Sequence, residues 1–229
     1  MTLRLEVIVQ TVADALAAEA GGADRLEVVR EIERDGLTPP LDLVRDIQGA
    51  TALPLRVMVR ESDGFGITGR DELIVLQRAF ADLADLGVHG AVVGFARDGA
   101  LDIALMTSVL AVAPGLPVTL HRAFDAVADP EAAIDAALAF PQIDRILTSC
   151  GSGDWTARCE RLAGWSRRAG PRVTFIPGGG LDEAALSVLA RCPAAAEAHV
   201  GKAAREPRES TAPVSAARVA RLKSLIANP

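Results

Sequence analysis

The sequence predicts one α/β domain folded as a closed (β/α)8 barrel of the TIM type. Short apolar runs with strand character alternate eight times with segments whose apolar residues recur at helical spacing. Strict alternation of strand and helix favours a parallel sheet, because parallel neighbours need a crossover connection. The 229 residues give each unit under about 30 residues, which fits a closed barrel better than an open doubly wound sheet, the alternative that the pattern leaves open. No linker rich in Pro, Gly or Ser divides residues 1–229, so we expect a single domain.

The predicted elements follow one another along the whole chain. Apolar and β-branched runs predict strands over 3–9, 25–29, 55–59, 91–95, 118–121, 143–148, 173–176 and 198–200. Helical spacing predicts helices over 12–20, 41–47, 71–86, 102–112, 130–139, 155–168, 182–191 and 214–227.

Local residues explain where several helices begin and end. Gly21-Gly22 ends the first helix and Gly87 the third, because glycine adopts the backbone conformation that terminates a helix. The second helix follows a Thr-Pro-Pro start at 38–40. Asp129-Pro130 begins the fifth helix and Leu181-Asp182 the seventh, through a capping carboxylate or a proline in the first turn.

Composition excludes several classes of partner. The net charge of −6 argues against nucleic acid and anionic membranes. No apolar run approaches the ~20 residues of a membrane-spanning helix. The three cysteines, Cys150, Cys159 and Cys192, form no CxxC motif, which is typical of reduced thiols in the cytoplasm. We therefore expect a cytoplasmic protein whose partner is a small anionic ligand or a metal ion, and the sequence leaves open a homo-oligomer.

The stretch from Leu120 to Asp125 is the first candidate for chemistry. His121, Arg122 and Asp125 emerge together where a buried strand ends and a loop begins. Strand ends of this kind are rigid, and in a barrel they carry the functional groups. The alternative interpretation is an Arg–Asp pair that fixes the loop, with His121 as its hydrogen-bond partner.

Further polar residues interrupt or end other predicted strands. They are Glu6, Glu27, Arg60, Ser149 and His199. A carboxylate in a barrel strand is expected to face the barrel axis, where burial raises its pKa unless a cation compensates. Arg60, Arg122 or a metal ion is predicted to supply that charge. An internal Glu–Arg network without a ligand is the alternative.

A glycine run after the seventh strand is a candidate phosphate site. Gly178, Gly179 and Gly180 allow backbone N–H groups to approach a ligand, and the following helix points its positive end there. Gly201 and Lys202 follow the next strand, and the loops after strands seven and eight often bind phosphate in this fold. The alternative is a plain turn, in which Asp182 caps the helix and repels an anion.

The sequence resembles the CutC family, named for copper homeostasis. The residues that carry the resemblance are Gly21–Glu27, Asp35–Pro39, His121–Asp125, Leu147–Ser149 and Pro177–Gly180, in the same order over essentially the whole chain. The resemblance implies a (β/α)8 barrel and an association with copper.

This chain departs from the family at the positions that concern copper. Members proposed to bind copper carry cysteines where Ile8, Val9 and Val29 stand here. Because Cu(I) prefers thiolate ligands, the remaining set of Glu, His and Arg suits a polar small molecule or a harder divalent metal better. Two hypotheses therefore remain: a copper-handling protein, and an enzyme that acts on a small anionic metabolite, phosphorylated metabolites included, through Glu and His acid–base chemistry.

Overall fold

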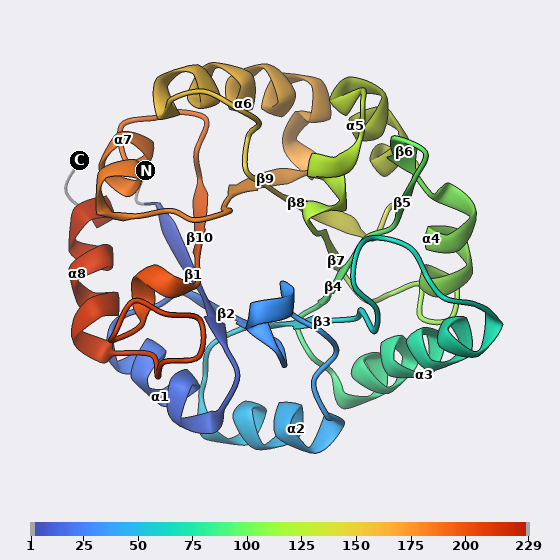
Figure 1. Cartoon of the computed structure of the whole chain (residues 1–229), viewed down its shortest axis with the longest axis horizontal. Helices are drawn as coiled ribbons and strands as arrows, with labels where there is room; N and C mark the ends of the chain where they lie inside the picture. Colours follow the sequence, from blue (N-terminus) through green and yellow to red (C-terminus); the bar gives the residue numbers. More distant parts are fainter. Residues whose placement is uncertain (1–2, 228–229) are drawn as a thin grey trace.

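The computed structural model describes residues 3–227, in which eight parallel strands form one sheet. The strands are β1 (Arg4–Val9), β2 (Arg25–Val28), β3 (Leu55–Met58), β4 (Ala91–Val93), β7 (Val118–Leu120), β8 (Ile143–Thr148), β9 (Thr174–Pro177) and β10 (Glu197–Val200). The helices are α1 (Val12–Ala20), α2 (Leu41–Ala50), α3 (Arg70–Leu86), α4 (Ile103–Leu110), α5 (Pro130–Leu138), α6 (Trp155–Ala169), α7 (Glu183–Leu189) and α8 (Ala216–Ala227). The helices form a ring outside the strands (Figure 1).

The strands form a nearly closed barrel. Their order is β10-β1-β2-β3-β4-β7-β8-β9, and every neighbouring pair is parallel. Within residues 3–227, β9 and β10 pack side by side without a ladder of backbone hydrogen bonds between them. The predicted (β/α)8 architecture is confirmed, because every predicted strand and helix is present with its ends within a few residues of the expected positions.

The register of the strands decides which side chains meet inside the barrel. Glu6 of β1 lies opposite His199 of β10 and opposite Arg25 of β2. Glu27 lies opposite Ile8, one layer nearer the carboxyl ends of the strands. Acidic and basic groups from three adjacent strands are therefore stacked along the barrel axis.

Apolar packing lies between the sheet and the helices. Alternate β1 residues such as Leu5 and Val7 are fully buried and belong to the main hydrophobic cluster, together with helix residues such as Ala15 and Leu222. A parallel sheet covered by helices buries both faces, so this layer provides most of the hydrophobic stabilisation. The barrel interior holds the buried charged residues together with a small separate apolar cluster of Val29, Met58 and Val92.

The structure also contains short elements that the sequence analysis did not predict. They are the hairpin β5 (Ala96–Arg97) and β6 (Ala100–Leu101) and the 3-10 helices η1 (Ile32–Arg34), η2 (Arg122–Ala126), η3 (Gly170–Arg172) and η4 (Lys202–Ala204). The hairpin turns at Asp98 and Gly99, both with positive φ, a dipeptide typical of two-residue hairpin turns.

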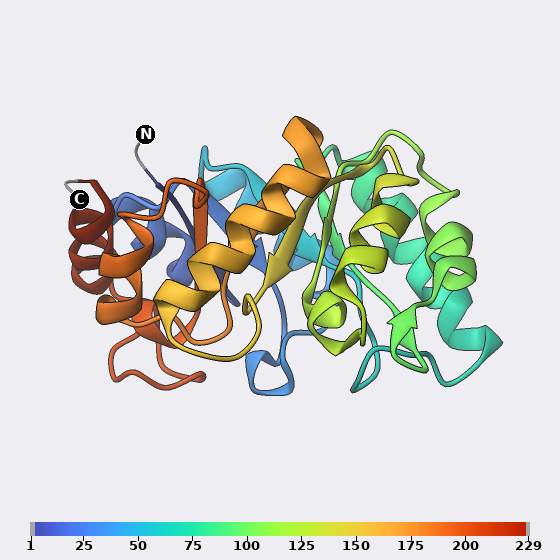
Figure 2. The same cartoon turned by 90° about the horizontal axis from the view of Figure 1, so that it is seen from above.

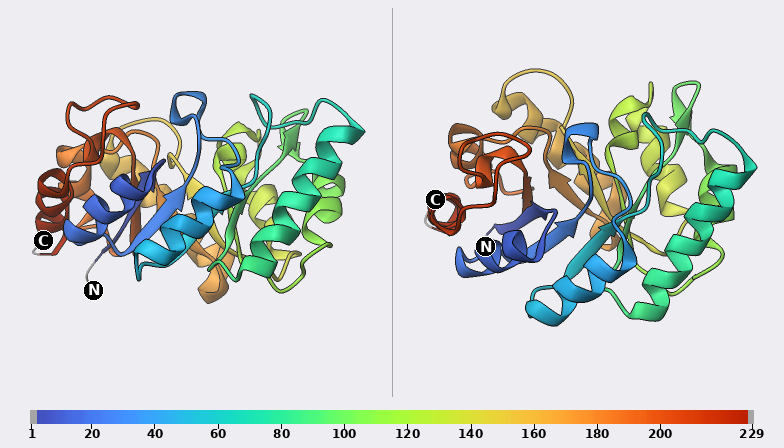
Figure 3. Two further views of the ribbon diagram at one scale, coloured as in Figure 1. Left: turned by 90° about the horizontal axis from the view of Figure 1, so that it is seen from below. Right: turned by 60° about the horizontal axis from the view of Figure 1, so that its bottom comes forward.

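The segments that follow β2, β3 and β4, and the 205–214 segment after η4, extend from the same face of the barrel (Figures 2 and 3). This is the carboxyl face of the strands, where barrels of this type carry their sites. None of the helices in residues 3–227 is both long and apolar enough to cross a membrane.

Candidate active site

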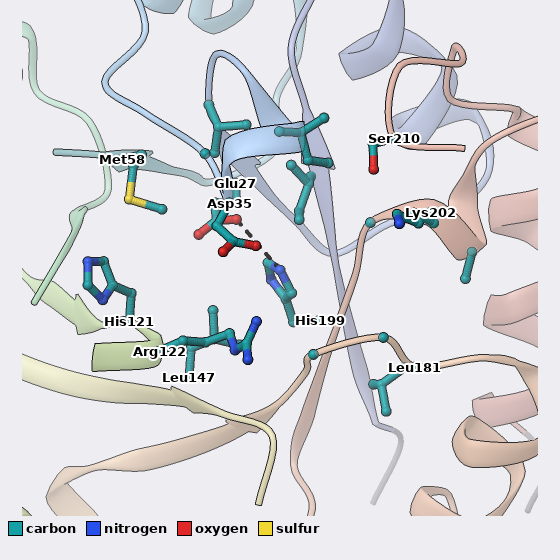
Figure 4. Close-up of a pocket in the computed structure, with 18 of the residues that line it drawn as sticks. Glu27, Asp35, Met58, His121, Arg122, Leu147, Leu181, His199, Lys202 and Ser210 are labelled. Carbon is teal, nitrogen blue, oxygen red and sulfur yellow. Dashed lines mark ion pairs between the residues drawn. The ribbon is translucent and has the colours of Figure 1, made fainter. Parts of the chain in front are cut away.

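A cavity of about 790 Å³ opens at the carboxyl face of the barrel. Of the residues that the sequence pointed to, nine line it: Glu27, Arg60, His121, Arg122, Gly179, Gly180, His199, Gly201 and Lys202. Figure 4 shows several of them around the same space. Glu6, Asp125, Ser149 and Gly178 are not part of the lining, although Glu6 contacts His199 and Asp125 contacts Arg122, both of which are.

Glu27, His199 and Glu6 form a line from the cavity into the barrel. His199 Nε2 lies 3.6 Å from Oε2 of Glu27, and His199 Nδ1 lies 2.8 Å from Oε1 of Glu6. All three side chains are buried. The imidazole is thus held between two carboxylates, one of which borders the cavity.

The surroundings separate the proton affinities of these two carboxylates. Burial raises the pKa of Glu27 to about 7, and the nearby Glu6 charge raises it while His199 lowers it. Burial also raises the pKa of Glu6, but Arg25 and His199 outweigh this effect and hold it well below its usual value. Burial lowers the pKa of His199, yet Glu27 and Glu6 together raise it above its ordinary value.

The cation that compensates Glu6 is Arg25, not Arg60 or Arg122 as the sequence analysis predicted. Arg25 forms buried ion pairs with Glu6 and with Glu197. Arg25 begins β2 and Glu197 begins β10, so neither stands at the carboxyl end of a strand, where barrels of this type carry their functional groups. The expectation failed because strand register, rather than position in the chain, brings these groups together.

Arg60 shapes the cavity wall through backbone carbonyl groups. Its Nε donates to the carbonyls of Ser62 and Gly64 at 3.1 Å, and its Nη1 donates to those of Arg34 and Gly36. The guanidinium therefore ties together the loops after β2 and β3, and its positive charge contributes to the field in the cavity.

The surroundings of His121 favour its neutral form. Its Nδ1 accepts the backbone N–H of Ala123 at 3.0 Å. Burial, with the positive charges of Arg60 and Arg122, lowers the pKa of His121 to about 3. The hypothesis that His121 is a proton-donating imidazolium is therefore not favoured by its surroundings.

Asp125 and Ser149 stabilise the loop that carries Arg122. One Asp125 oxygen accepts from the Thr148 hydroxyl at 2.6 Å, and the other accepts from Arg122 Nε at 3.1 Å. The Ser149 N–H also donates to this carboxylate. The Arg122 side chain remains 44% exposed, so its outer N–H groups can meet a ligand at the cavity.

The glycine run is a tight turn beside the cavity. Gly178 donates its N–H to the Thr148 carbonyl at 2.8 Å, while Gly179 and Gly180 have φ of +79° and +98°. The Asp182 carboxylate accepts the Ala185 N–H at 2.8 Å and thereby caps α7. The start of this helix is therefore occupied by its own cap.

Two polar residues of the cavity wall were not singled out by the sequence analysis. Arg208 and Ser210 reach the cavity from the 205–214 segment, alongside Lys202. No periodicity or motif singles them out, because a loop's path is not encoded in local spacing. With them, the cationic groups bordering the cavity are Arg60, Arg122, Lys202 and Arg208, against the carboxylates Glu27, Asp35 and Asp182.

The donors at the cavity do not fit a copper ion well. No group of three or more His, Cys, Asp or Glu side chains within residues 3–227 is arranged to hold a metal. The soft donor at the cavity is the Met58 thioether. Cys159 of α6 and Cys192 lie elsewhere, along a separate surface groove that both residues line. Cys150 is fully buried.

Comparisons with known proteins agree on one family. The family model described as "CutC family" matches residues 3–204. A "family protein CutC" from Agrobacterium fabrum is 38% identical over 189 residues, covering 81% of this chain and 73% of the relative. The human "Copper homeostasis protein cutC homolog" is 35% identical over 211 residues, covering 90% and 75%.

Solved structures share the architecture. A CutC protein from Streptococcus agalactiae superposes with a TM-score of 0.78 at 20% identity, over 87% of this chain and 98% of that one. The α subunit of tryptophan synthase from Legionella pneumophila gives a TM-score of 0.70 at 13% identity, over 99% and 94%. At these identities the likeness concerns the barrel fold.

Proposed function

This chain belongs to the CutC family, and within it we propose that the chain is an enzyme that acts on a small anionic metabolite by acid–base chemistry at the barrel mouth. Glu27 is the proposed base, and His199 is its acid partner. Arg122, Lys202 and Arg208 are proposed to bind the anionic group.

This proposal rests on the position of Glu27 at the cavity and on its raised pKa. Its carboxylate borders the cavity, and its pKa is raised to about 7. A general base is most effective when its pKa lies near the working pH, because it is then both available and sufficiently basic. A buried carboxylate with this pKa in a cavity is a strong candidate for catalysis.

His199 supports the same chemistry. Its Nδ1 is fixed by Glu6 at 2.8 Å and its Nε2 faces Glu27 at 3.6 Å, so a proton taken by Glu27 can be shared with the imidazole. Glu6 stays ionised because Arg25 compensates its charge. Glu6 and Arg25 therefore act as positioning residues for the pair.

The rim of the cavity favours an anion as ligand. Arg122, Lys202 and Arg208 come from three different segments and border the same space. Converging cations of this kind raise the local concentration of anions and orient them. A phosphate or carboxylate group would lie at the rim, with the reacting carbon deeper, near Glu27.

Turnover of a metabolite panel tests the proposal. The protein is incubated with phosphorylated sugars and hydroxy acids in D2O, and conversion or deuterium incorporation is followed by proton NMR. We expect at least one compound to react with the wild-type chain and none with Glu27→Gln. Glu33→Gln, a change at an exposed residue of η1, serves as the matched control and should retain activity. Equal rates for Glu27→Gln and the wild type would refute the role of Glu27.

Copper binding is the second candidate, and one observation favours it. Cys159 and Cys192 line the same groove, where the two thiols are close enough that Cys192, after the larger effect of burial, helps to raise the pKa of Cys159. Two neighbouring thiols suit Cu(I) better than the oxygen- and nitrogen-rich cavity does. In this alternative, copper is cargo held on the helical layer rather than a participant at the barrel mouth.

A further inference from the structure

His121 occupies a fixed place in the cavity wall. Its backbone N–H donates to the Val93 carbonyl at 3.2 Å, which continues the ladder between β4 and β7. The ring packs against Phe65 with a centroid distance of 5.5 Å. Gly94 also lies against the ring, and an added Cβ there would be 2.7 Å from Nδ1. These close neighbours therefore fix the orientation of the imidazole.

The hydrogen bond to Ala123 determines the tautomer of His121. A backbone N–H can only donate, so Nδ1 must present its lone pair to the Ala123 amide at 3.0 Å. Burial and the positive charges of Arg60 and Arg122 keep the ring neutral. The single ring proton of a neutral imidazole then resides on Nε2.

The Nε2–H group is a buried donor without a protein acceptor. Within residues 3–227 no side-chain or backbone group accepts from it, and the residue is only 4% exposed. The same residue borders the cavity that contains Glu27 and His199. Buried polar groups are nearly always hydrogen-bonded in folded proteins, so an unpaired donor on a residue that borders a cavity points to a ligand acceptor there.

We propose that His121 is a neutral hydrogen-bond donor to a carbonyl oxygen of the substrate, so that the reaction is removal of a proton from the carbon next to that carbonyl. This inference rests on the proposed acid–base function and narrows its substrate class to anionic aldehydes, ketones or keto acids. His121 would then be a catalytic residue that keeps its own proton throughout.

The step balances without any redox partner. The Glu27 carboxylate takes the proton from the carbon, and the electrons of the C–H bond form a carbon–carbon double bond. The carbonyl electron pair moves onto oxygen, and the resulting enolate oxygen accepts a hydrogen bond from His121 Nε2–H. Return of the proton from Glu27 to either end of the enolate regenerates the enzyme and gives back the substrate or an isomer. A neutral imidazole suits this role, because it stabilises the oxyanion without protonating it.

Two amide substitutions test the roles of the two ring nitrogens separately. His121→Asn keeps an acceptor near the position of Nδ1 but offers no donor near that of Nε2. His121→Gln places an amide N–H₂ group near the position of Nε2. If the inference is correct, His121→Gln should behave more like the wild type than His121→Asn does.

Oxalate is the binding probe, because it is a planar mimic of an enediolate with two adjacent oxygen atoms. By calorimetry, we expect oxalate affinity to fall at least about tenfold in His121→Asn and only a few-fold in His121→Gln, the size of effect expected for a charge-assisted hydrogen bond. Inorganic phosphate, held by the rim cations, should bind equally well to both variants. Oxalate that fails to bind the wild type at millimolar concentration, or that binds His121→Asn as well as the wild type, would overturn the inference.

Heteronuclear NMR of the histidine ring nitrogens gives a readout that needs no substrate. We expect the His121 spectrum to show protonation at Nε2 alone and no titration between about pH 5 and 9. A proton on Nδ1 or titration near neutrality would refute the donor role. If the NMR and oxalate results hold but no carbonyl compound exchanges hydrogen with D2O, the site binds an oxyanion, and it is the acid–base function that fails.

Discussion

His199 Nδ1 lies 2.8 Å from Glu6 Oε1, and the two residues stand directly opposite one another on β10 and β1. This contact connects the cavity to the charged interior, because Glu6 also pairs with Arg25. Replacing Glu6 should therefore affect both the chemistry at the mouth and the stability of the barrel.

Glu6→Gln is expected to destabilise the fold by roughly 3 kcal/mol, since removal of one member of a buried ion pair leaves its partner uncompensated. The pKa of His199 should fall, because one of the two carboxylates that raise it is lost. Urea unfolding and histidine NMR measure the two effects. Glu33→Gln at the surface should change neither, and an unchanged His199 titration in Glu6→Gln would contradict the proposed coupling.

Lowering the pH should destabilise the protein through His121. The pKa of this residue falls from an ordinary value of 6.5 to about 3 in the folded state. Between about pH 6.5 and pH 3, the unfolded chain therefore binds a proton at this histidine that the folded chain does not bind. The stability present above about pH 6.5 is lost progressively toward pH 3. The loss should be on the order of a few kcal/mol and absent in His121→Gln. Parallel pH profiles of unfolding free energy for the two proteins would decide this.

Glu27 should produce the opposite trend. Its pKa is raised from 4.5 to about 7 on folding, so the stabilisation from its bound proton is complete below about pH 4.5 and is lost as the pH rises through 7. Glu27→Gln cannot lose a proton and should be more stable than the wild type at about pH 8, while its proposed activity is abolished. A variant that is less stable than the wild type at high pH would argue against a desolvated carboxyl at this position.

Two glycine substitutions should have opposite effects. In Gly94→Ala the new Cβ would lie 2.7 Å from His121 Nδ1 and 2.9 Å from a Leu120 methyl group, so the ring must move and the fold should be destabilised. Gly49 lies in α2 with nothing within 4 Å of an added Cβ. Gly49→Ala should stabilise the protein by about 0.5–1 kcal/mol, because alanine has the higher helix propensity. Thermal unfolding compares them, and a Gly94→Ala protein with an unperturbed His121 spectrum would show that the wall is less rigid than described.

Cu(I) binding is expected to depend on the helical groove rather than on the barrel mouth. In a competition titration with a Cu(I) chelator under reducing conditions, Cys159→Ser should remove whatever Cu(I) the chain binds, because a single thiol is left in the groove. His199→Gln should leave the affinity unchanged. Tight one-to-one binding that survives Cys159→Ser and is lost in His199→Gln would place copper at the mouth and favour metal handling over catalysis.

The fold and part of the cavity wall could be predicted from the sequence. Apolar periodicity identifies strands and helices, and once a barrel is assumed, polar residues at strand ends such as His121 and Arg122 must share one face. Their detailed roles could not be predicted. Arg60, expected to neutralise a glutamate, instead binds backbone carbonyls, because the loops after β2 and β3 fold over it.

The ion-pair partners inside the barrel could not be predicted from local sequence patterns. Arg25 and Glu197 are far apart in the chain and meet only because β1 pairs with both β2 and β10 in a particular register. Arg208 reaches the cavity through a loop whose path depends on tertiary contacts. A local pattern was present for the β5–β6 hairpin, since Asp98-Gly99 is a typical two-residue turn.

The ion pairs inside the barrel also bear on how this protein can evolve. Arg56 pairs with Asp144, Asp144 with Arg145, Arg145 with Glu197, Glu197 with Arg25, and Arg25 with Glu6, in a continuous series of alternating charge that reaches His199. Because losing one buried charge leaves its neighbour uncompensated, single neutralising substitutions along this series should be selected against. Lineages that change the series should do so by exchanging acid and base together, and the residues at the floor of the barrel should co-vary with those at its mouth.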